Sequence, residues 1–199
     1  MAKLIFNYSA MNSGKTLDLL RTAYNYEKNG LKVIVMKPSI DTKGGDSIVT
    51  RVGLDRKVDY LIDEDCDIYE LLCDKIDGVK CIFVDESQFL SVDHVNQLFK
   101  ITKLLDVPVI CYGLRTNFKS ELFLGSMRLL ALADELNEFK SLCSCGNMAR
   151  FNARRLNGEF LYDGDDILID GSSEVEYVPL CGECYLREVS KVKKIMLEK

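Results

Sequence analysis

The chain has one histidine, no excess of basic residues and no long apolar run, and each shortage argues against a class of function. With a single histidine, a histidine general base is disfavoured, which leaves a carboxylate as the natural candidate. Lys and Arg number 26 against 31 Asp and Glu, and this acidic balance argues against a nucleic-acid partner. No apolar run approaches the ~18 residues that a membrane span needs, so no membrane partner is expected.

The N-terminus also lacks the features of an export signal. The segment MAKLIFNYSA carries one lysine and a very short apolar run, unlike a secretory signal peptide. We therefore expect a cytoplasmic protein in a reducing compartment, where closely spaced cysteines favour metal binding over disulfides.

What the chain does contain, over residues 1–141, is an alternation of strand-like and helix-like segments. Apolar runs predict strands at 3–8, 32–38, 81–85 and 107–114. Helical spacing and capping residues predict helices at 16–29, 67–76, 91–105 and 121–133. Residues 39–56 show no period and are predicted to be a loop. This order predicts an α/β fold with a mostly parallel sheet flanked by helices. Because the strands are continuously apolar, we expect both faces of the sheet to be covered.

The pattern changes near Leu142. Beyond it come two cysteine pairs, the turn signal Asn157-Gly158 and a long polar stretch. We expect two domains: an ATP-binding α/β domain at 1–141, and a small β-rich domain at 142–199 with a substrate-covering loop and a C-terminal helix.

The segment SAMNSGKT, from Ser9 to Thr16, has the spacing of a phosphate-binding loop (G-x-x-x-x-G-K-[ST]) with serine at the first position. In such loops backbone N–H groups and the dipole of the following helix bind phosphate, the lysine reaches the β- and γ-phosphates, and the hydroxyl holds Mg²⁺. Lys15 and Thr16 would take these parts. The alternative is a polar loop, capped by Ser13, that contains Gly-Lys-Thr by chance.

A second motif, CIFVDES, ends a predicted strand in two acids. An acid at this position holds Mg²⁺ in phosphate-loop enzymes, and a neighbouring carboxylate can act as a base. Asp85 would be the acid on the metal side and Glu86 its neighbour; an ordinary helix start is the alternative. Two such motifs in order on adjacent strand–helix units predict a P-loop (RecA-like) nucleotide-binding sheet.

The cysteine pairs supply four thiolates. Their spacing predicts a closed, structural Zn²⁺ site formed by Cys143, Cys145, Cys181 and Cys184. Four unrelated reduced cysteines, or a redox pair at Cys181 and Cys184, are the alternatives.

Taken in order, these motifs resemble a known family. SAMNSGKT, VDESQFL (84–90), YGLRTNFKSELFLGS (112–126) and the cysteine pairs resemble the small, tetrameric, zinc-containing (type II) thymidine kinases. The resemblance covers nearly the whole chain. It implies transfer of the γ-phosphate of ATP to the 5′-hydroxyl of thymidine or deoxyuridine, giving dTMP in pyrimidine nucleotide salvage. It also implies Mg²⁺ with ATP, structural Zn²⁺, a homotetramer and feedback inhibition by dTTP.

The resemblance also assigns roles to residues. Glu86 matches the catalytic base, Thr16 and Asp85 match the Mg²⁺ site, and the polar stretch from Asn157 to Glu176 resembles the loop that covers the base. The ATP site matches Ser9, Ala10, Met11, Asn12, Ser13, Gly14, Lys15, Thr16, Asp85, Glu86, Ser87 and Gln88. The nucleoside site matches Met11, Phe89, Leu114, Phe118, Phe123 and Tyr177.

Several assignments have competing interpretations. Phe89 and Phe123 could equally be core residues, and Gln88 could orient a substrate or be an exposed helix residue. Lys43 and Arg51 could neutralise phosphate or be solvated loop charges. His94, in the helix after the acid pair, is predicted to face solvent. For the whole chain, the rivals are a P-loop ATPase whose zinc ribbon acts on nucleic acid and a non-catalytic nucleotide-binding scaffold.

Overall fold

The computed structural model describes residues 1–162, 164 and 175–197. At its centre is a six-stranded sheet in the order β5-β2-β6-β7-β1-β8, and every pairing in it is parallel. The strands are β1 (Leu4–Ser9), β2 (Lys32–Pro38), β5 (Tyr60–Ile62), β6 (Val79–Val84), β7 (Val109–Leu114) and β8 (Glu135–Glu138). The mostly parallel sheet is confirmed. The edge strands β5 and β8 were not predicted from the sequence.

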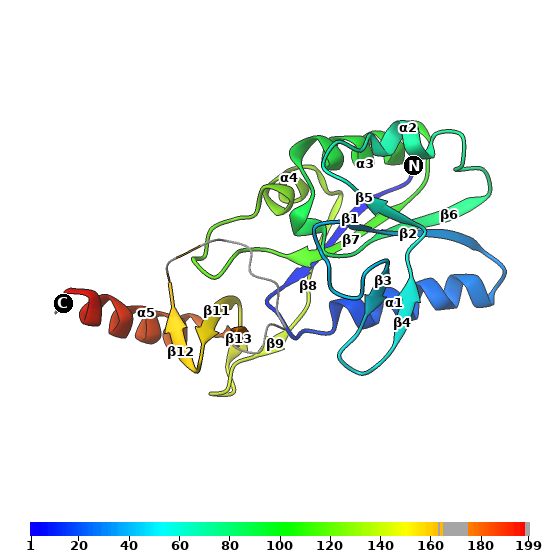
Figure 1. Cartoon of the computed structure of the whole chain (residues 1–199). Coiled ribbons are helices and arrows are strands. Elements are labelled where there is room, and N and C mark those ends of the chain that lie inside the picture. Colours follow the sequence, from blue (N-terminus) through cyan, green and yellow to red (C-terminus); the bar gives the residue numbers. More distant parts are fainter. Residues whose placement is uncertain (163, 165–174, 198–199) are drawn as a thin grey trace.

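Helices cover both faces of this sheet, as Figure 1 shows. Packed on one face are α2 (Ile68–Leu72), α3 (Val92–Leu104) and α4 (Leu124–Leu132), and on the other lies α1 (Lys15–Lys28). Neighbouring residues of β6 separate between the two layers: Ile82 packs in the cluster that includes Leu98 of α3, and Phe83 in the cluster that includes Leu19 of α1. Strands buried on both faces explain why these segments are continuously apolar.

The prediction of a loop over 39–56 was wrong in part. The segment contains an antiparallel hairpin of β3 (Ser47–Val49) and β4 (Asp55–Lys57), which Figure 1 shows beside α1. The hairpin is anchored by Ile48, which is buried in the α1 cluster. Strands of three residues are too short to show a period in sequence, which is why the pattern was missed.

The start of α3 confirms one prediction and corrects another. Ser91 is the N-cap, and its Oγ accepts a hydrogen bond from the His94 backbone N–H at 3.1 Å. His94 does not face solvent: it is 5% exposed, and its Nδ1 accepts the Ser91 N–H at 3.3 Å. The imidazole therefore completes a capping box, the place usually taken by Glu or Gln.

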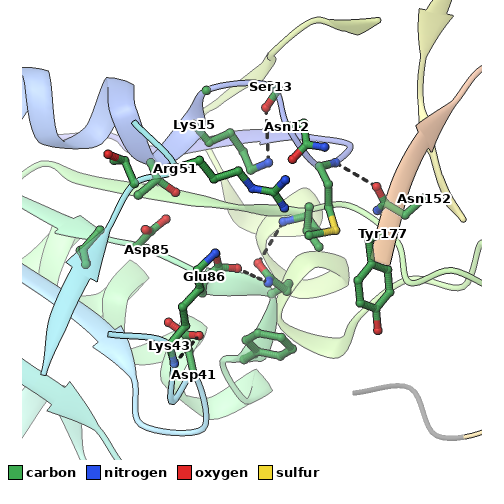
Figure 2. A pocket seen from close by; sticks show the side chains of 18 of the residues that line it. Asn12, Ser13, Lys15, Asp41, Lys43, Arg51, Asp85, Glu86, Asn152 and Tyr177 are labelled. Carbon is green, nitrogen blue, oxygen red and sulfur yellow. Dashed lines mark hydrogen bonds between the residues drawn. The ribbon is translucent and has the colours of Figure 1, made fainter. Parts of the chain in front are cut away.

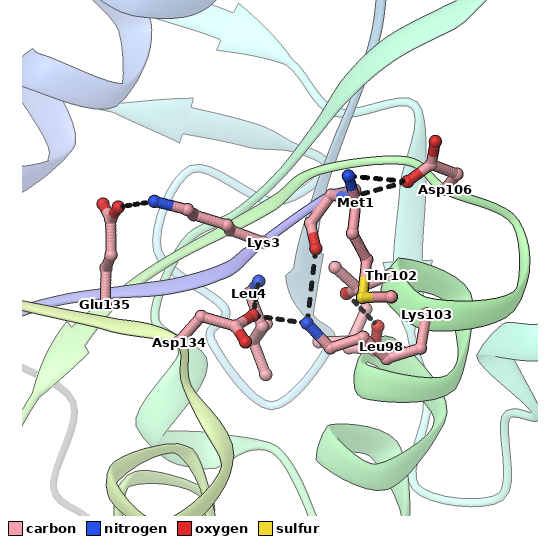
Figure 3. Close-up of polar contacts among 10 residues, drawn as sticks. Met1, Lys3, Leu4, Leu98, Thr102, Lys103, Asp106, Asp134 and Glu135 are labelled. Carbon is pink, nitrogen blue, oxygen red and sulfur yellow. Dashed lines mark hydrogen bonds and ion pairs between the residues drawn. The ribbon is translucent and has the colours of Figure 1, made fainter.

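A polar cluster holds the beginning of β1 (Figure 3). This is the amino end of the parallel strands, whereas the acid pair follows the carboxyl end of β6. The carboxylate of Asp134 accepts from the Leu4 N–H at 2.8 Å and from Lys103 Nζ at 2.6 Å. Lys103, and then the Leu4 N–H, hold the pKa of Asp134 below its usual value. Lys3 pairs with Glu135 beside it.

The C-terminal region (142–197) is small and β-rich. The chain enters it through β9 (Ser141–Leu142), so the expected domain boundary falls inside that strand. Its elements continue with β10 (Met148–Ala149), β11 (Phe151–Leu156), β12 (Glu159–Leu161), β13 (Val175–Leu180) and α5 (Gly182–Leu197). Asn157 and Gly158 both have positive φ, as a tight hairpin turn between β11 and β12 requires. Across the part of the chain described, every helix is too short or too polar to span a bilayer.

Candidate functional site

A cavity of about 390 Å³ opens at the carboxyl ends of β1, β6 and β7. Parallel sheets bind ligands at this edge, where the loops after the strands converge. The cavity is lined by the 11–16 loop, the acid pair after β6, a group of apolar side chains, and residues of the C-terminal region (Figure 2). Of the predicted residues, it is lined by Met11, Asn12, Ser13, Gly14, Lys15, Thr16, Asp85, Glu86, Gln88, Phe89, Leu114, Phe118, Phe123 and Tyr177.

Ser9, the residue that departs from the usual glycine, fits the loop without strain. Its φ is not positive; the left-handed positions fall on Asn12 (φ 62°) and Gly14 (φ 83°). Ser9 is buried and its hydroxyl lies 2.5 Å from Ser13 Oγ. A side chain at this position is therefore accommodated, and it contributes a polar contact inside the loop.

Lys15 folds back over this loop. Its Nζ donates to Ser9 Oγ at 2.7 Å, to the Ala10 carbonyl at 3.1 Å and to Ser13 Oγ at 3.4 Å. Burial lowers the pKa of Lys15 to about 8, although the carboxylates of Glu86 and Asp85 oppose that shift. An ammonium in this low-dielectric position interacts strongly with any anion that enters the loop.

Asp85 follows β6 and is almost fully buried. Burial, and then the charge of Glu86, raise the pKa of Asp85 to about 7, against the opposing effects of the Glu86 N–H, Lys15 and the Thr16 hydroxyl. The interaction with Thr16 brings together the two side chains predicted to hold Mg²⁺. A carboxylate and a hydroxyl are hard oxygen ligands of the kind Mg²⁺ prefers, so the donor set fits this cation.

Glu86 is half-buried and has φ 46°, a left-handed conformation that is uncommon for a residue other than glycine. Its Oε2 accepts from Gln88 Nε2 at 2.6 Å. Gln88 is 2% exposed, so the interpretation as a solvated helix residue is wrong. Its Oε1 accepts the Leu114 N–H at 2.9 Å, which ties the short 3-10 turn η1 (Ser87–Phe89) to β7. The carboxylate of Glu86 is thereby held at the cavity by a fixed partner.

This junction leaves no room for a side chain on the neighbouring strand. A Cβ on Gly113 would lie 2.7 Å from Ser87 Oγ and 2.8 Å from Gln88 Oε1. Ser87 itself is buried, and its Oγ donates to the Tyr112 carbonyl at 2.9 Å. Three of the predicted ATP-site residues are buried and do not line the cavity: Ser9, Ala10 and Ser87.

The apolar wall of the cavity is built from residues around β7 and η1. Phe89 and Phe123 meet edge to face with ring centroids 5.7 Å apart, and both remain half-buried because they border the cavity. Phe118 is nearly fully buried and packs under the guanidinium of Arg154, 3.8 Å from the ring centroid. The wall is thus partly core and partly cavity surface, which reconciles the two interpretations of these aromatic residues.

Asn152 in β11 lines the cavity and was missed in the sequence. Its Oδ1 accepts the Met11 N–H at 2.9 Å, and its Nδ2 donates to the Thr116 carbonyl at 3.0 Å. One buried amide therefore joins the 11–16 loop, the loop after β7 and the C-terminal region. An asparagine in a short strand carries no local signal of this role, because its partners lie 141 and 36 residues away.

Lys43 and Arg51, on the segment around the β3–β4 hairpin, also border the cavity. Figure 2 shows the Arg51 side chain extending into it alongside Lys15. Lys37, fully buried at the end of β2, holds this segment by donating to Asp41 Oδ2, the Lys43 carbonyl and the Ser47 carbonyl at 3.0, 2.7 and 3.1 Å. The anchoring role of Lys37 was not predicted from the sequence.

Tyr177 of β13 lines the cavity on the side formed by the C-terminal region (Figure 2). The predicted covering loop, 157–176, begins with the β12 hairpin. Its residues 163 and 165–174 lie outside the described part of the chain.

The four predicted zinc ligands come together: the sulfurs of Cys143, Cys145, Cys181 and Cys184 lie within 4.8 Å of one another. Zn–S bonds of about 2.3 Å in a tetrahedron place sulfurs roughly 3.8 Å apart, so the cluster fits Zn²⁺. The separation between Cys145 Sγ and Cys181 Sγ is 3.6 Å.

The acidity of one thiol of the cluster, that of Cys143, suits a cation. Burial raises the pKa of Cys143, but hydrogen bonds from the N–H groups of Cys145 and Cys181 and from neighbouring thiols outweigh it and lower that pKa to about 6. A thiolate is therefore favoured in the cluster. Hydrogen bonding with Cys145 and then with Cys181 raises the pKa of Cys184 to about 12.

Comparisons with known proteins agree with one another. The family model described as thymidine kinase matches residues 2–185. The thymidine kinase of Enterobacteria phage T4 is 43% identical over 185 residues, covering 91% of this chain and 94% of that protein. That of Francisella tularensis subsp. holarctica (strain LVS) is 42% identical over 188 residues, covering 91% and 95%. That of Streptococcus pyogenes serotype M1 is 40% identical over 187 residues, covering 93% and 97%.

Proposed function

Because the chain belongs to the thymidine kinase family, we propose that it transfers the γ-phosphoryl group of ATP to the 5′-hydroxyl of thymidine, and of deoxyuridine, in nucleotide salvage. The observation that supports this most directly is that one cavity joins a phosphate-binding loop, an acid pair and an aromatic wall. The phosphates of ATP would meet Lys15 and the loop N–H groups, and the nucleoside base would meet the aromatic wall.

In this proposal Glu86 is the general base. Its carboxylate takes the proton of the 5′-hydroxyl as the bond between O5′ and the γ-phosphorus forms and the bond from that phosphorus to the β,γ-bridging oxygen breaks, releasing ADP. Gln88 keeps the carboxylate oriented. Lys15 and the backbone N–H groups of the loop stabilise charge on the transferred group. Arg51, extending into the same cavity, adds positive charge there.

Two metal ions belong to the proposal. Thr16 and Asp85 would hold Mg²⁺, which neutralises phosphate charge when bound. The four cysteines would hold Zn²⁺ with no open coordination position, so its contribution is structural. We further propose, from family membership, a homotetramer inhibited by dTTP that acts in the cytoplasm, with a division into domains at 1–141 and 142–199.

A coupled assay with MgATP and a panel of four deoxynucleosides tests the function. We expect ADP release that depends on thymidine or deoxyuridine and is not supported by deoxyadenosine or deoxyguanosine. ATP hydrolysis that needs no nucleoside and is stimulated by DNA would contradict the proposal. It would instead support the alternative of an ATPase acting on nucleic acid, which the family membership does not favour. ATP binding without any turnover would instead support a scaffold.

A further inference from the structure

One tyrosine connects the four-cysteine cluster with the wall of the cavity. Tyr185 lies in the first turn of α5, directly after Cys184, and its N–H donates to the Cys181 carbonyl at 2.9 Å. Its hydroxyl donates to the backbone carbonyl of Phe118 at 2.8 Å, across 67 residues of sequence. Tyr185 is 7% exposed and Phe118 1%, so this hydrogen bond is shielded from water.

The ring of Tyr185 is held on two sides. It stacks on Phe151 of β11 with centroids 4.9 Å apart and an interplanar angle of 22°. It also meets Tyr162 edge to face, at 5.5 Å and 85°. A tyrosine has only two side-chain torsions, and rings packed on both sides fix them, so the hydroxyl has a defined position.

The loop that presents Phe118 to the cavity is closed at its base by a single antiparallel bridge between Thr116 and Leu122. It runs between β7 and α4, and inside it the Asn117 side chain accepts the N–H groups of Lys119 and Glu121, each at 2.9 Å. These bonds shape the tip of the loop, whereas the bond from Tyr185 ties the Phe118 backbone to α5. Losing that donor would leave a buried carbonyl unsatisfied at the residue whose ring forms the wall.

We propose that Tyr185 is a positioning residue for the nucleoside. By donating to the Phe118 carbonyl, its hydroxyl makes the position of the aromatic wall depend on the first turn of α5, which carries Cys184. The inference rests on the proposed function and adds to it a distinct prediction. Disturbing the Tyr185 hydroxyl should weaken thymidine binding and spare ATP, because among the contacts described this hydroxyl touches the nucleoside wall and none of the phosphate-loop residues.

Tyr185→Phe removes the hydroxyl and keeps the packed ring. We expect the KM for thymidine to rise about fivefold, because a neutral hydrogen bond contributes about 1 kcal/mol and 1.4 kcal/mol is tenfold. We expect kcat and the KM for ATP to stay within roughly twofold of wild type. The rise in Tm caused by thymidine should shrink to match, while bound zinc per chain, measured by mass spectrometry, stays at the wild-type value.

Tyr69→Phe is the control. Tyr69 lies in α2, packs half-buried against the core of the α/β part, and belongs neither to the cavity lining nor to the predicted covering loop. We expect wild-type KM values for this variant. An unchanged thymidine KM in Tyr185→Phe would overturn the inference, as would a parallel loss of zinc, ATP affinity and kcat, which is the sign of general structural damage. A wild-type protein that does not phosphorylate thymidine would overturn the proposed function itself, and this inference with it.

Discussion

At the residue scale, Glu86 combines a left-handed backbone with a carboxylate held by Gln88. A non-glycine residue keeps such a backbone only when its surroundings impose it, and such residues cluster at functional sites. The left-handed backbone of Glu86 is held between β6, which precedes it, and η1, which follows it and is hydrogen-bonded to β7. The backbone therefore aims the side chain at the cavity rather than along the protein surface.

We predict that the Glu86→Gln variant loses turnover but still binds thymidine. The amide has the same shape and can still accept from Gln88, but it cannot take a proton, so kcat should fall about 10²- to 10⁴-fold. The thymidine concentration that half-saturates the rise in Tm should change little. Glu64→Gln, at an exposed site on the surface, serves as the control with full activity. Residual turnover above one tenth of wild type would remove Glu86 as the base.

Asp85, which we propose as a Mg²⁺ ligand, illustrates how such a residue can reduce stability. Its pKa in the folded protein is raised to about 7, mainly by burial, so between about pH 4 and pH 7 the folded state binds a proton that the unfolded state has released. The contribution of this group to stability is therefore largest below pH 4 and is lost as the pH rises through 7. Above that pH the protein carries an ionised, buried carboxylate.

We therefore expect Asp85→Asn to be more stable than wild type at pH 8 and inactive as a kinase. Without Mg²⁺ or nucleotide, a gain of about 2 kcal/mol would raise Tm by roughly 4–8 °C in a chain of this size. The difference should narrow towards pH 4, where wild-type Asp85 is itself neutral. Thermal melts at the two pH values measure both effects. A variant less stable than wild type at pH 8 would contradict the assignment of burial as the cause of the raised pKa.

The sequence predicts some residues of the site and not others, for a physical reason. Phosphate loops, strand-end acids and cysteine pairs place their chemistry within a few consecutive residues, so the sequence alone predicts candidate sites at Lys15, Asp85 and the four cysteines; the structure places the first two at the cavity and the four cysteines in one cluster. Asn152, Lys37 and Tyr185 act by binding backbone groups, and the segments that Asn152 and Tyr185 join lie far apart in sequence. Any polar side chain in such a position looks ordinary until the fold is known.

At the element scale, the long strands were predicted from continuous apolar runs of several residues, and α1 and α3 from helical periodicity that repeats over two or more turns. The elements that were missed, β3, β4, β5 and β8, have three or four residues each. β5 and β8 exist because they pair with β2 and β1 at the two edges of the sheet. Their formation depends on a neighbour rather than on their own composition.

The β3–β4 segment gives a prediction at this scale, through its anchor Lys37. Lys37→Met would remove all three hydrogen bonds that the buried ammonium donates, leaving the Lys43 and Ser47 carbonyls without that donor. We expect a loss of about 2–4 kcal/mol in the free energy of unfolding and faster hydrogen exchange over 41–49. Turnover should also fall, because Lys43 and Arg51 border the cavity.

Lys32→Met on the same strand is the control. Its ammonium also donates to two carbonyls, those of Lys75 and Asp77, but it is exposed to solvent. We expect a change within about 0.5 kcal/mol. Equal effects of the two substitutions would show that burial of Lys37 does not anchor the segment.

At the scale of the whole molecule, the site is assembled from two parts of the chain. The α/β part supplies the 11–16 loop and the acid pair, whereas the C-terminal region contributes Asn152 and Tyr177 to the cavity. Contacts between the parts include the hydrogen bond that the Met11 N–H donates to Asn152 Oδ1, at 2.9 Å, and the one that Asn152 Nδ2 donates to the Thr116 carbonyl, at 3.0 Å. The C-terminal region has a small core centred on the cysteines, so a bound metal would decide whether these contacts persist.

Cys145→Ser tests that dependence. Cys145 is the exposed member of the cluster, so its loss leaves no buried cavity and acts through the metal alone. We expect less than one zinc per chain, a lower Tm, and a thymidine KM that rises more than the KM for ATP. Cys73→Ser, a half-buried thiol at the end of α2, removes a sulfur elsewhere and should change none of these quantities. Full zinc content with an unchanged Tm in Cys145→Ser would show that the four thiols are not a metal site. Zinc loss with unchanged thymidine KM would show that the metal stabilises the C-terminal region without shaping the cavity.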